Sequence, residues 1–510
     1  MGRLTSLVKE TAIYGTSSIL GRMLNWLLVP LYTQYLLPAD YGIVTELYAF
    51  AAFLFIVYTY GMETAFFRFS TKIEKKKSLI LDQSEASILI SSILLSFMLI
   101  VFATPITNFL EYPGKEKYII WFSVILAVDA IVSIPFANLR LQQKAKRFAI
   151  IKLVNIFLNV GLNLFFIVFC NYIVNSPNES ALKLFVDRFF DQDNLVDYIF
   201  ISNLLASLAV AVIFLKDIVR IRFRFDRIVL LEMYRYAFPI MIMSLAGVTN
   251  EMLSRAVLKK WLPEGFYPGI SNQAALGIFG ASYKLSVFMT LTIQAFRYAA
   301  EPFFFSRAKD KDSPVLFATV MQWFIIFGSL ILVVIVLNLD IIGYLFLRND
   351  AYWDGLTVVP ILLLANLFLG IYYNLSVWFK LTDQTYYGTL ISVIGAVFTI
   401  VLNYILIPFI GYMGSAIATL SCYLLMSFLS YSLGKRRYPI PYKIWKSLLY
   451  IAIGVAISYL GFNRPETYTI NFKLYQLTLI LLYVIFVVFM EKEALRSLLK
   501  YVRHENKNRK

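Results

Sequence analysis

The sequence predicts an all-α polytopic membrane protein, and composition is the first reason. Hydrophobic residues make up 59% of the 510 residues, and the mean hydropathy is +0.70. Only 15% of the residues are charged, whereas a soluble domain typically carries about 25%. The second reason is that the apolar residues are gathered into long runs. A backbone exposed to lipid must satisfy its own hydrogen bonds, so these runs are expected to be helices.

Fourteen apolar segments are long enough to cross a bilayer, since a spanning helix needs about 20 residues. The predicted spans are 10–37, 42–67, 83–110, 118–139, 149–173, 194–215, 229–258, 272–298, 315–337, 354–379, 385–408, 412–433, 444–462 and 472–491. The first run is long enough to span, so we expect no cleavable signal peptide.

Basic residues follow the even-numbered spans, which is the third reason for this fold class. They cluster at 68–77, 140–152, 216–227, 297–311 and 435–446, and again in the tail at 493–510. Connections after odd-numbered spans carry few. Cytoplasmic loops are the basic ones, so both termini are expected in the cytoplasm. The net charge of +16 is then a topology signal, and no nucleic-acid partner is predicted.

An internal repeat is predicted from two pairs of similar stretches. LNLFFIVF at 162–169 resembles LNYILIPF at 402–409, with an offset of 240. The same offset places Arg140 on Lys380. PADYGIVTELY at 38–48 resembles a second copy that is split between Pro263 and 275–283. Each copy holds six spans, and an even number of spans keeps the two copies parallel.

Two parallel six-helix repeats are a plan of transporters, with the site near the bilayer midplane. The predicted organisation is an N-terminal six-helix bundle at 1–228, a C-terminal six-helix bundle at 229–433, two additional transmembrane helices at 434–492 and a basic cytoplasmic tail at 493–510.

The residues that enzymes and metal sites require are scarce. The single histidine, His504, lies in the charged tail, and the cysteines, Cys170 and Cys422, lie in separate apolar runs. There is no cysteine framework and no metal-ligand spacing. The connections are too short to hold a water-soluble catalytic domain. We therefore expect a protein that is not an enzyme and has no catalytic residue, no metal and no cofactor.

Arg22 is a permanent cation inside the first span. A charge there costs about 2.5–3.5 kcal/mol on insertion scales, so it is expected to face the bundle interior or a water-filled cavity. Ser18, Arg22, Asn25 and Tyr32 share one helical face. That face is predicted to line a cavity.

Two more cations lie in the spans that begin the second copy. Arg255 follows Ser254 on the polar side of its helix, and Lys284 shares a face with Gln273, Gly277 and Gly280, whose glycines allow close approach. Together with Arg22, these cations would line a cavity between the two halves. An anionic cargo would fit it, and arginine forks suit phosphate or pyrophosphate.

Three acids inside spans, Glu46, Asp129 and Glu251, are candidates for ion coupling or for pairing with these cations. An acidic lining would instead favour a proton- or sodium-coupled pump of cationic drugs.

Structural interpretations of the same residues stay open. Arg255 lies four residues after Glu251, so the two can pair. Lys284 can snorkel or pair with Glu46, and Glu63 can cap a water-exposed turn. The ladder of Asn155, Asn159 and Asn163 is more typical of contacts between helices than of a ligand site.

Several stretches resemble the oligosaccharide flippases of the multidrug/oligosaccharidyl-lipid/polysaccharide exporter superfamily. They are YGTSSILGRMLNWLLVPLYTQYLLPADYGIVTELYAF at 14–50, NLRLQQKAKRF at 138–148, QAFRYAAEPFFFSRAKDKD at 294–312, FKLTDQTYYG at 379–388 and LNYILIPFIGYMGSAIATLSCYLL at 402–425. The resemblance covers most of the first twelve spans, and its specificity lies in the combination and order of these stretches.

The resemblance implies a flippase of the Wzx type, with two six-helix bundles forming a V and two extra helices. Such proteins move undecaprenyl-pyrophosphate-linked oligosaccharide across the bacterial inner membrane for surface polysaccharide synthesis, and their cavity is typically cationic. Arg22, Arg255 and Lys284 would then hold the pyrophosphate, with membrane lipids around the tail and a coupling cation, Na⁺ or H⁺, driving the cycle. A cation-coupled drug antiporter and a membrane-embedded polysaccharide polymerase are the alternatives.

Overall fold

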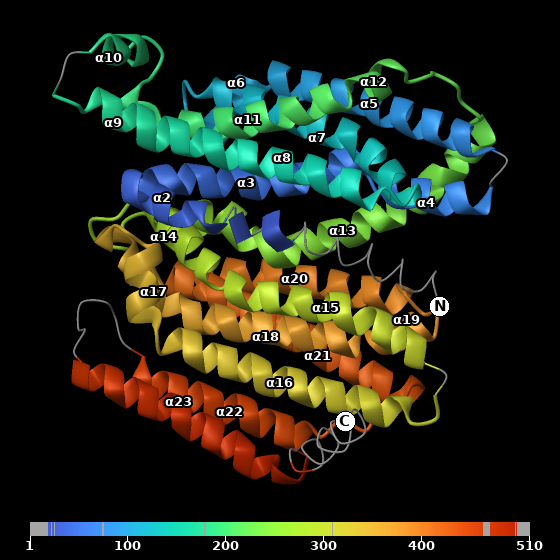
Figure 1. The fold of residues 1–510 in the computed structure, drawn as a ribbon, viewed down its shortest axis with the longest axis vertical. Coiled ribbons are helices and arrows are strands. Elements are labelled where there is room, and N and C mark those ends of the chain that lie inside the picture. The colour runs from blue at the N-terminus through green and yellow to red at the C-terminus, as the bar shows by residue number, and fades with distance from the viewer. Residues whose placement is uncertain are drawn as a thin grey trace, which may run out of the picture. The chain divides into compact units, whose positions relative to one another are not determined.

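The computed structural model describes residues 19–21, 23–24, 26–73, 76–177, 180–308, 310–462, 470–494 and 496. Every regular element in this part of the chain is a helix (Figure 1). Among the described residues, 12 helices are long and apolar enough to cross a membrane, or up to 13 if α14 and α15 count as one span. The predicted fold class is confirmed. The first predicted span, 10–37, falls largely outside the described residues.

The chain divides into two compact units. The first contains Met1–Lys284 and Ser392–Ala418, and the second contains Leu285–Ile391 and Thr419–Lys510. The domain boundaries at 228, 433 and 492 are derived from the sequence repeat, and they stay a prediction.

The first unit holds most of the described helices up to Lys284. They are α2 (Leu28–Tyr35), α3 (Pro38–Thr59), α4 (Met62–Lys72), α5 (Lys77–Val101), α6 (Ala103–Phe109), α7 (Glu116–Leu141), α8 (Ala145–Asn163), α9 (Asn171–Val174), α10 (Ala181–Val186), α11 (Leu195–Ile213), α12 (Leu215–Val219), α13 (Arg227–Trp261) and α14 (Asn272–Leu285). A π-helical stretch at Leu164–Cys170 continues α8. Residues 392–418 add most of α20 (Tyr386–Ile410) and the start of α21 (Tyr412–Arg437).

The second unit holds the remaining helices. They are α15 (Val287–Arg307), α16 (Ser313–Val336), α17 (Leu339–Phe346), α18 (Val359–Leu375), α19 (Val377–Leu381), the rest of α20 and α21, α22 (Ile444–Gly461) and α23 (Ile470–Met490). A 3₁₀ stretch at Asp350–Val358 leads into α18.

Local chemistry explains where several helices begin and end. Pro38 occupies the first turn of α3, where a missing N–H costs nothing. Tyr60 and Gly61 both have positive φ, 34° and 76°, so the predicted span 42–67 consists of two consecutive helices, α3 and α4, within one candidate membrane span, Pro38–Lys72. Asp226 caps α13 by accepting from the main-chain N–H groups of its first turn. Lys76 lies 2.7 Å from Asp226, and this bond together with the cap lowers the pKa of the Asp226 carboxyl.

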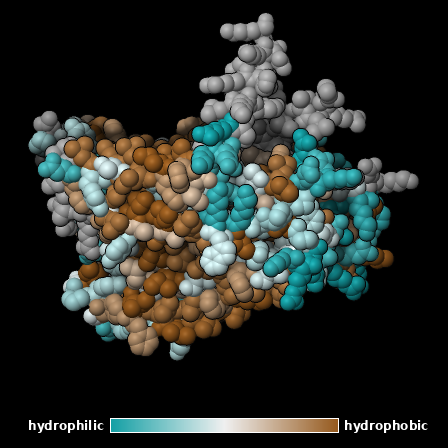
Figure 2. Space-filling model, turned by 90° about the horizontal axis from the view of Figure 1, so that it is seen from below, coloured by the Kyte–Doolittle hydropathy of each residue, from teal (hydrophilic) through white to brown (hydrophobic). Residues whose placement is uncertain are grey.

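The interior of the first unit is apolar, and one such cluster joins α4, α5, α7 and α13. Met62, Phe66, Ile88, Ile134 and Met233 are all buried in it. Figure 2 shows that hydrophobic side chains also dominate one outer face of the molecule, with hydrophilic ones gathered toward one end. Large apolar side chains that are exposed in this way are expected where lipid replaces water.

Helices α22 and α23 are tied to the rest of the second unit at both ends. At one end, Lys473 of α23 lies 2.9 Å from Asp340. At the other end, Glu491 lies 2.8 Å from Lys446 and accepts from Tyr450 and from Gln322 of α16. Burial raises the pKa of Glu491, but the bonds from Lys446 and Tyr450 outweigh burial and hold that pKa below its ordinary value.

A similar ion pair in each unit agrees with the predicted repeat, although only its basic residues are 240 residues apart. In the first unit, Arg140 at the end of α7 pairs with Glu63 of α4. In the second unit, Lys380 of α19 lies 2.6 Å from Glu301 of α15. Arg140 and Lys380 are the two residues that the offset of 240 superimposes. Glu63 is therefore an ion-pair partner as well as a residue of the first turn of α4.

The helix ends beside these ion pairs also match. Gln143 and Asp383, again 240 residues apart, both have positive φ, 57° and 55°. The residue after each of them, Lys144 or Gln384, donates its main-chain N–H to the carbonyl five residues earlier, at 2.9 and 2.8 Å. Two independent helix ends share this geometry, which supports the repeat beyond similarity of sequence.

Candidate functional site

A cavity of about 370 Å³ lies inside the first unit and is named here the Arg255 cavity. Its lining combines two cations with hydroxyl and amide groups and a few apolar side chains. The lining residues are Leu28, Val29, Tyr32, Tyr41, Val44, Thr45, Tyr48, Ala49, Asn155, Asn159, Asn203, Met252, Arg255, Gly280 and Lys284. Two of the three predicted cations, Arg255 and Lys284, are thus brought together in one cavity.

Arg255 is held in place by its own helix and by an aromatic ring. It is 7% exposed. One guanidinium nitrogen donates to the main-chain oxygen of Glu251 at 2.8 Å, and the guanidinium carbon lies 4.1 Å from the ring centre of Tyr283. No described residue accepts a hydrogen bond from its Nε. A stacked guanidinium with unused donors is preorganised to bind an oxyanion.

The predicted ion pair between Arg255 and Glu251 is not formed among the described residues. The bond from Arg255 goes to the backbone of Glu251, and the Glu251 side chain is exposed. The charge of Arg255 is therefore not neutralised one helical turn away. This leaves it available to the contents of the cavity.

Lys284 lies at the end of α14, and its side chain is exposed. Its main-chain oxygen accepts from Trp26 Nε1 at 2.9 Å, which fixes the backbone there. Within the part of the chain that the structure describes, its ammonium group has no hydrogen bond or ion pair. The interpretation in which Lys284 pairs with Glu46 is wrong, because Glu46 pairs with Lys259.

The asparagine ladder of α8 has two roles. Asn163 is buried, accepts from the Tyr32 hydroxyl at 2.9 Å and donates to Asn159, so it joins helices as predicted. Asn155 and Asn159 line the Arg255 cavity. The described lining contains no carboxylate, so the cavity presents two positive charges among neutral donors and acceptors. A low-dielectric site of this kind attracts an anion.

Helices α3 and α14, which both contribute residues to the lining of this cavity, pack against each other in a tight seam. A Cβ added to Gly277 would overlap the main-chain oxygen of Pro38, and one added to Gly42 would overlap that of Gln273. The glycines of α14 therefore allow the close approach that the sequence predicts.

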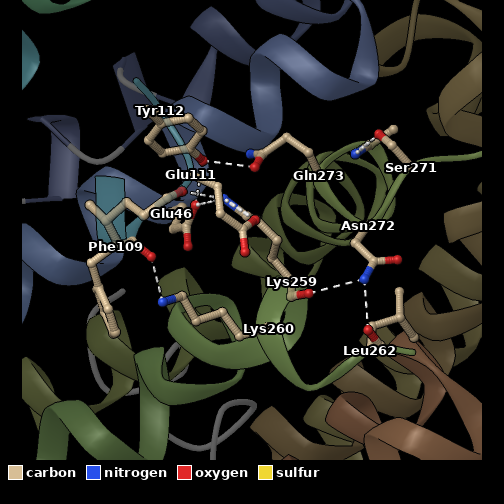
Figure 3. Close-up of polar contacts among 12 residues, drawn as sticks. Glu46, Phe109, Glu111, Tyr112, Lys259, Lys260, Leu262, Ser271, Asn272 and Gln273 are labelled. Carbon is tan, nitrogen blue, oxygen red and sulfur yellow. Dashed lines mark hydrogen bonds and ion pairs between the residues drawn. The ribbon is translucent and has the colours of Figure 1, made fainter. Parts of the chain in front are cut away.

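A second pocket, of about 580 Å³, lies in the same unit next to Gln273 of this seam and is named here the Lys259 pocket (Figure 3). Residues of the connections after α6 and α13 supply much of its wall. The lining residues are Glu111, Tyr112, Lys259, Lys260, Leu262, Glu264, Gly265, Ile270, Ser271, Asn272 and Gln273. It also holds two cations, but here carboxylates accompany them.

Glu46 is fully buried behind this pocket. Its Oε2 accepts from the Tyr112 hydroxyl and lies 3.5 Å from Lys259 Nζ (Figure 3). Lys259 also lies 3.3 Å from Glu111 and donates to the main-chain oxygen of Leu110. Burial and then the charge of Glu46 raise the pKa of the Tyr112 phenol, so Tyr112 remains a hydrogen-bond donor.

The remaining predicted site residues are placed as follows. Ser18, Arg22 and Asn25 lie outside the described residues. Asp129 is half-buried and lies near Ser207, Lys152 and Tyr48. Tyr48 lines the Arg255 cavity, but Asp129 itself is not among the residues that line either pocket.

Sequence reasoning missed Lys259 and Tyr112. Lys259 resembles an ordinary lysine at the end of a helix, because it stands next to Lys260 and two residues before the end of α13. Tyr112 lies in a connection. Only the buried Glu46, predicted as a pairing residue, pointed to a cation somewhere opposite it.

Comparison with known proteins agrees with this architecture. A model of the family described as "Polysaccharide biosynthesis protein" matches residues 7–307. No curated protein matches the sequence.

Several solved structures share the fold. The lipid II flippase MurJ in an inward closed conformation superimposes with a TM-score of 0.71 at 13% identity, covering 95% of this chain and 100% of that one. A multidrug resistance MATE family transporter in an inward-facing conformation superimposes with a TM-score of 0.60 at 14% identity, covering 82% of this chain and 94% of that one. A mutant MATE transporter of Vibrio cholerae superimposes with a TM-score of 0.52 at 14% identity, covering 86% of this chain and 98% of that one.

These likenesses show that the chain shares the fold of the MurJ flippase and of MATE transporters. Together with the family model, they agree with the resemblance seen in the sequence. It is a multi-pass membrane protein. The family model covers more than half of the sequence. The chain therefore belongs to the polysaccharide biosynthesis protein family.

Proposed function

We propose that the protein is a flippase that carries undecaprenyl-pyrophosphate-linked oligosaccharide across the bacterial inner membrane for surface polysaccharide synthesis. One observation carries the proposal: Arg255 and Lys284 share a cavity whose described lining has no carboxylate. A diphosphate is the anionic group of such a lipid. The guanidinium fork of Arg255 suits its oxygens, and Lys284 supplies a second charge.

In this proposal the cargo divides between the cavity and the lipid. The cations hold the diphosphate, the first sugars meet the amides of Asn155, Asn159 and Asn203, and the polyprenyl tail stays in the membrane. Arg22 is a third cavity cation, proposed from the sequence alone. The cavity opens to one side of the membrane at a time, by alternating access.

In this proposal both termini lie in the cytoplasm, because basic loops are expected on that side of the membrane. The seam between α3 and α14 then closes the outer side, and the Lys259 pocket faces outward.

A cation gradient of Na⁺ or H⁺, or the membrane potential, drives the return step in this proposal. Glu46, Asp129 and Glu251 are the candidate carriers. Glu46 is already held by Lys259 and Tyr112, whereas Asp129 lies near Lys152 and Glu251 is exposed.

A deletion strain tests the proposal directly. We expect a finished undecaprenyl-linked repeat unit to accumulate on the cytoplasmic leaflet, and the wild-type gene to clear it. Arg255→Gln and Lys284→Gln should each fail to clear it. Arg227→Gln, the same chemical change at the exposed start of α13, is the matched control and should behave as wild type. Normal clearance by both cavity variants would remove the basis of the proposal.

A cation-coupled drug antiporter is the alternative function, because the fold is similar to that of MATE transporters. Its mark would be efflux of cationic dyes that is lost on substitution of Glu46 or Asp129, with no lipid-linked build-up. The cavity argues against it, since two cations without an acid repel a cationic drug. A polysaccharide polymerase would instead join lipid-linked units and would not flip them. A polymerase also gives no reason for a fold that matches transporters.

A further inference from the structure

The Lys259 pocket has the composition of an anion site whose cations are occupied by the protein's own acids. We propose that Lys259 and Lys260 form a second phosphate-binding site, where the diphosphate of the cargo is held on its way out. Glu46 and Glu111 occupy that site until the anion arrives. The exit role rests on the proposed function, whereas the anion site itself does not.

The position of Lys259 relative to Arg255 is the first support. The two residues are one turn apart on α13, four residues or about 6 Å along the helix. Side chains at this spacing lie on the same helical face. An anion that moves from Arg255 along this face toward the end of α13 therefore reaches Lys259 as the next cation.

The way Lys259 is held is the second support. Its ammonium group lies 3.5 Å from Glu46 and 3.3 Å from Glu111. Charged N–H···O bonds are usually about 2.7–2.9 Å long, so neither carboxylate is at optimal distance. Lys259 is nevertheless 6% exposed, which makes its charge costly to leave unpaired. A phosphate with several oxygens could replace both acids at once.

The surroundings of Glu46 allow such an exchange. Tyr112 donates to Oε2 of Glu46 independently of Lys259, so this oxygen keeps a partner when Lys259 turns away. Oε1 has no hydrogen-bond partner among the described residues. Lys260 needs little rearrangement, because it is exposed at the same pocket and is held by the main-chain oxygen of Phe109 at 2.6 Å (Figure 3).

The pocket itself is large enough for the ligand. Its volume of about 580 Å³ is within the range of small-molecule sites. Ser271, Asn272 and Gln273 add hydroxyl and amide groups to the wall. This lining suits a diphosphate with an attached sugar better than an apolar ligand.

Titration of inorganic pyrophosphate into purified full-length protein, followed by calorimetry, tests the site. The parent protein carries Arg255→Gln and Lys284→Gln, so the cavity cations do not contribute. Glu46→Gln in this parent should tighten pyrophosphate binding roughly tenfold, since it removes the competing charge from Lys259. Lys259→Gln should abolish binding. Glu232→Gln, on the exposed far part of α13, is the matched control and should change affinity less than about twofold.

Glu111→Gln keeps the test valid if Glu46→Gln does not fold. The Glu111 side chain is 67% exposed, so its loss is tolerated, and we expect binding to tighten about threefold. Unchanged affinity in both acid variants, or full affinity in Lys259→Gln, would overturn the site. The outcome is separate from that of the flippase proposal. Absence of lipid-linked build-up in the deletion strain would refute the flippase and leave this titration unaffected.

Discussion

The Arg255 cavity and the Lys259 pocket contain similar cations in opposite settings. Both have two basic side chains in their walls, and the residues that name them are one turn apart on α13. The cavity has amides and hydroxyls around its cations and no described carboxylate. The pocket has Glu111 and Glu264 in its wall, with Glu46 behind.

The difference shows that a buried cation is informative only together with its partners. Lys259 is neutralised where it lies, and its pair helps to hold α3, α13 and the connection at 110–115 together. Lys284 has no such partner among the described residues and is exposed. A cation that lines a cavity without a partner is available to a ligand, so a functional role is the natural explanation for Lys284 and a structural one for Lys259.

The largest effect is expected from Gly277→Ala, which breaks the seam between the two sites. A Cβ there would overlap the main-chain oxygen of Pro38, and a backbone atom cannot give way cheaply. We expect little or no monodisperse protein, measured by size-exclusion chromatography. Gly161→Ala is the matched control, because a Cβ added there would meet no atom within 4 Å, and it should be neutral or stabilising by up to about 1 kcal/mol.

Lys259→Ala tests whether the Lys259 pocket is structurally paired. It leaves Glu46 buried with Tyr112 alone, and removal of one partner of a buried pair costs about 3–5 kcal/mol of unfolding free energy. We expect a fall of several degrees in the thermal unfolding midpoint in detergent. Lys260→Ala, at an exposed site, should cost less than about 1 kcal/mol. Adding Glu46→Gln to Lys259→Ala should restore part of the loss, and no restoration would mean that the pair is not coupled.

Asn159→Asp makes the Arg255 cavity resemble the Lys259 pocket. The new carboxylate competes with the cargo for the two cations, so clearance of the lipid-linked glycan should slow about tenfold. Asp keeps the acceptor that Asn163 uses, so the fold is retained. Asn175→Asp places the same charge at an exposed position and should have no effect. Equal transport by both variants would show that cavity charge does not matter.

The smallest effects are expected at the repeated ion pairs. Glu63→Gln and Glu301→Gln each remove a half-exposed partner, and such pairs are worth at most about 1 kcal/mol. The two midpoints of thermal unfolding should shift by similar small amounts. A large shift in only one of them would show that the two halves do not use the pair in the same way.

Much of the fold was predictable, because apolar runs and alternating basic loops are local signals. The repeat was visible in short stretches, and the structure adds the matching ion pairs of Arg140 and Lys380. The break at Tyr60 and Gly61 was not predicted, since an apolar run hides two left-handed residues.

The site was predictable only in part. The cost of burying charge identified Arg255 and Lys284, which share a cavity in the structure. This cost does not predict which acid forms an ion pair with which base, because the pairing depends on contacts between segments that are distant in the sequence. Glu46 and Lys259 are 213 residues apart in the chain, and Tyr112 reaches them from a connection. Pairing was therefore assigned to Lys284 instead of Lys259.

The two polar ties of α22 and α23 have a consequence for bilayer thickness. Helix α23 has 21 residues, or about 32 Å of length, which is close to the hydrocarbon thickness of about 30 Å. Lys473 near one end and Glu491 just past the other are both fixed to neighbouring helices, so this helical hairpin cannot slide or tilt independently. In a thinner or thicker membrane the lipid must therefore adjust its thickness around the hairpin. The hairpin then sets how deeply the second unit lies in the bilayer.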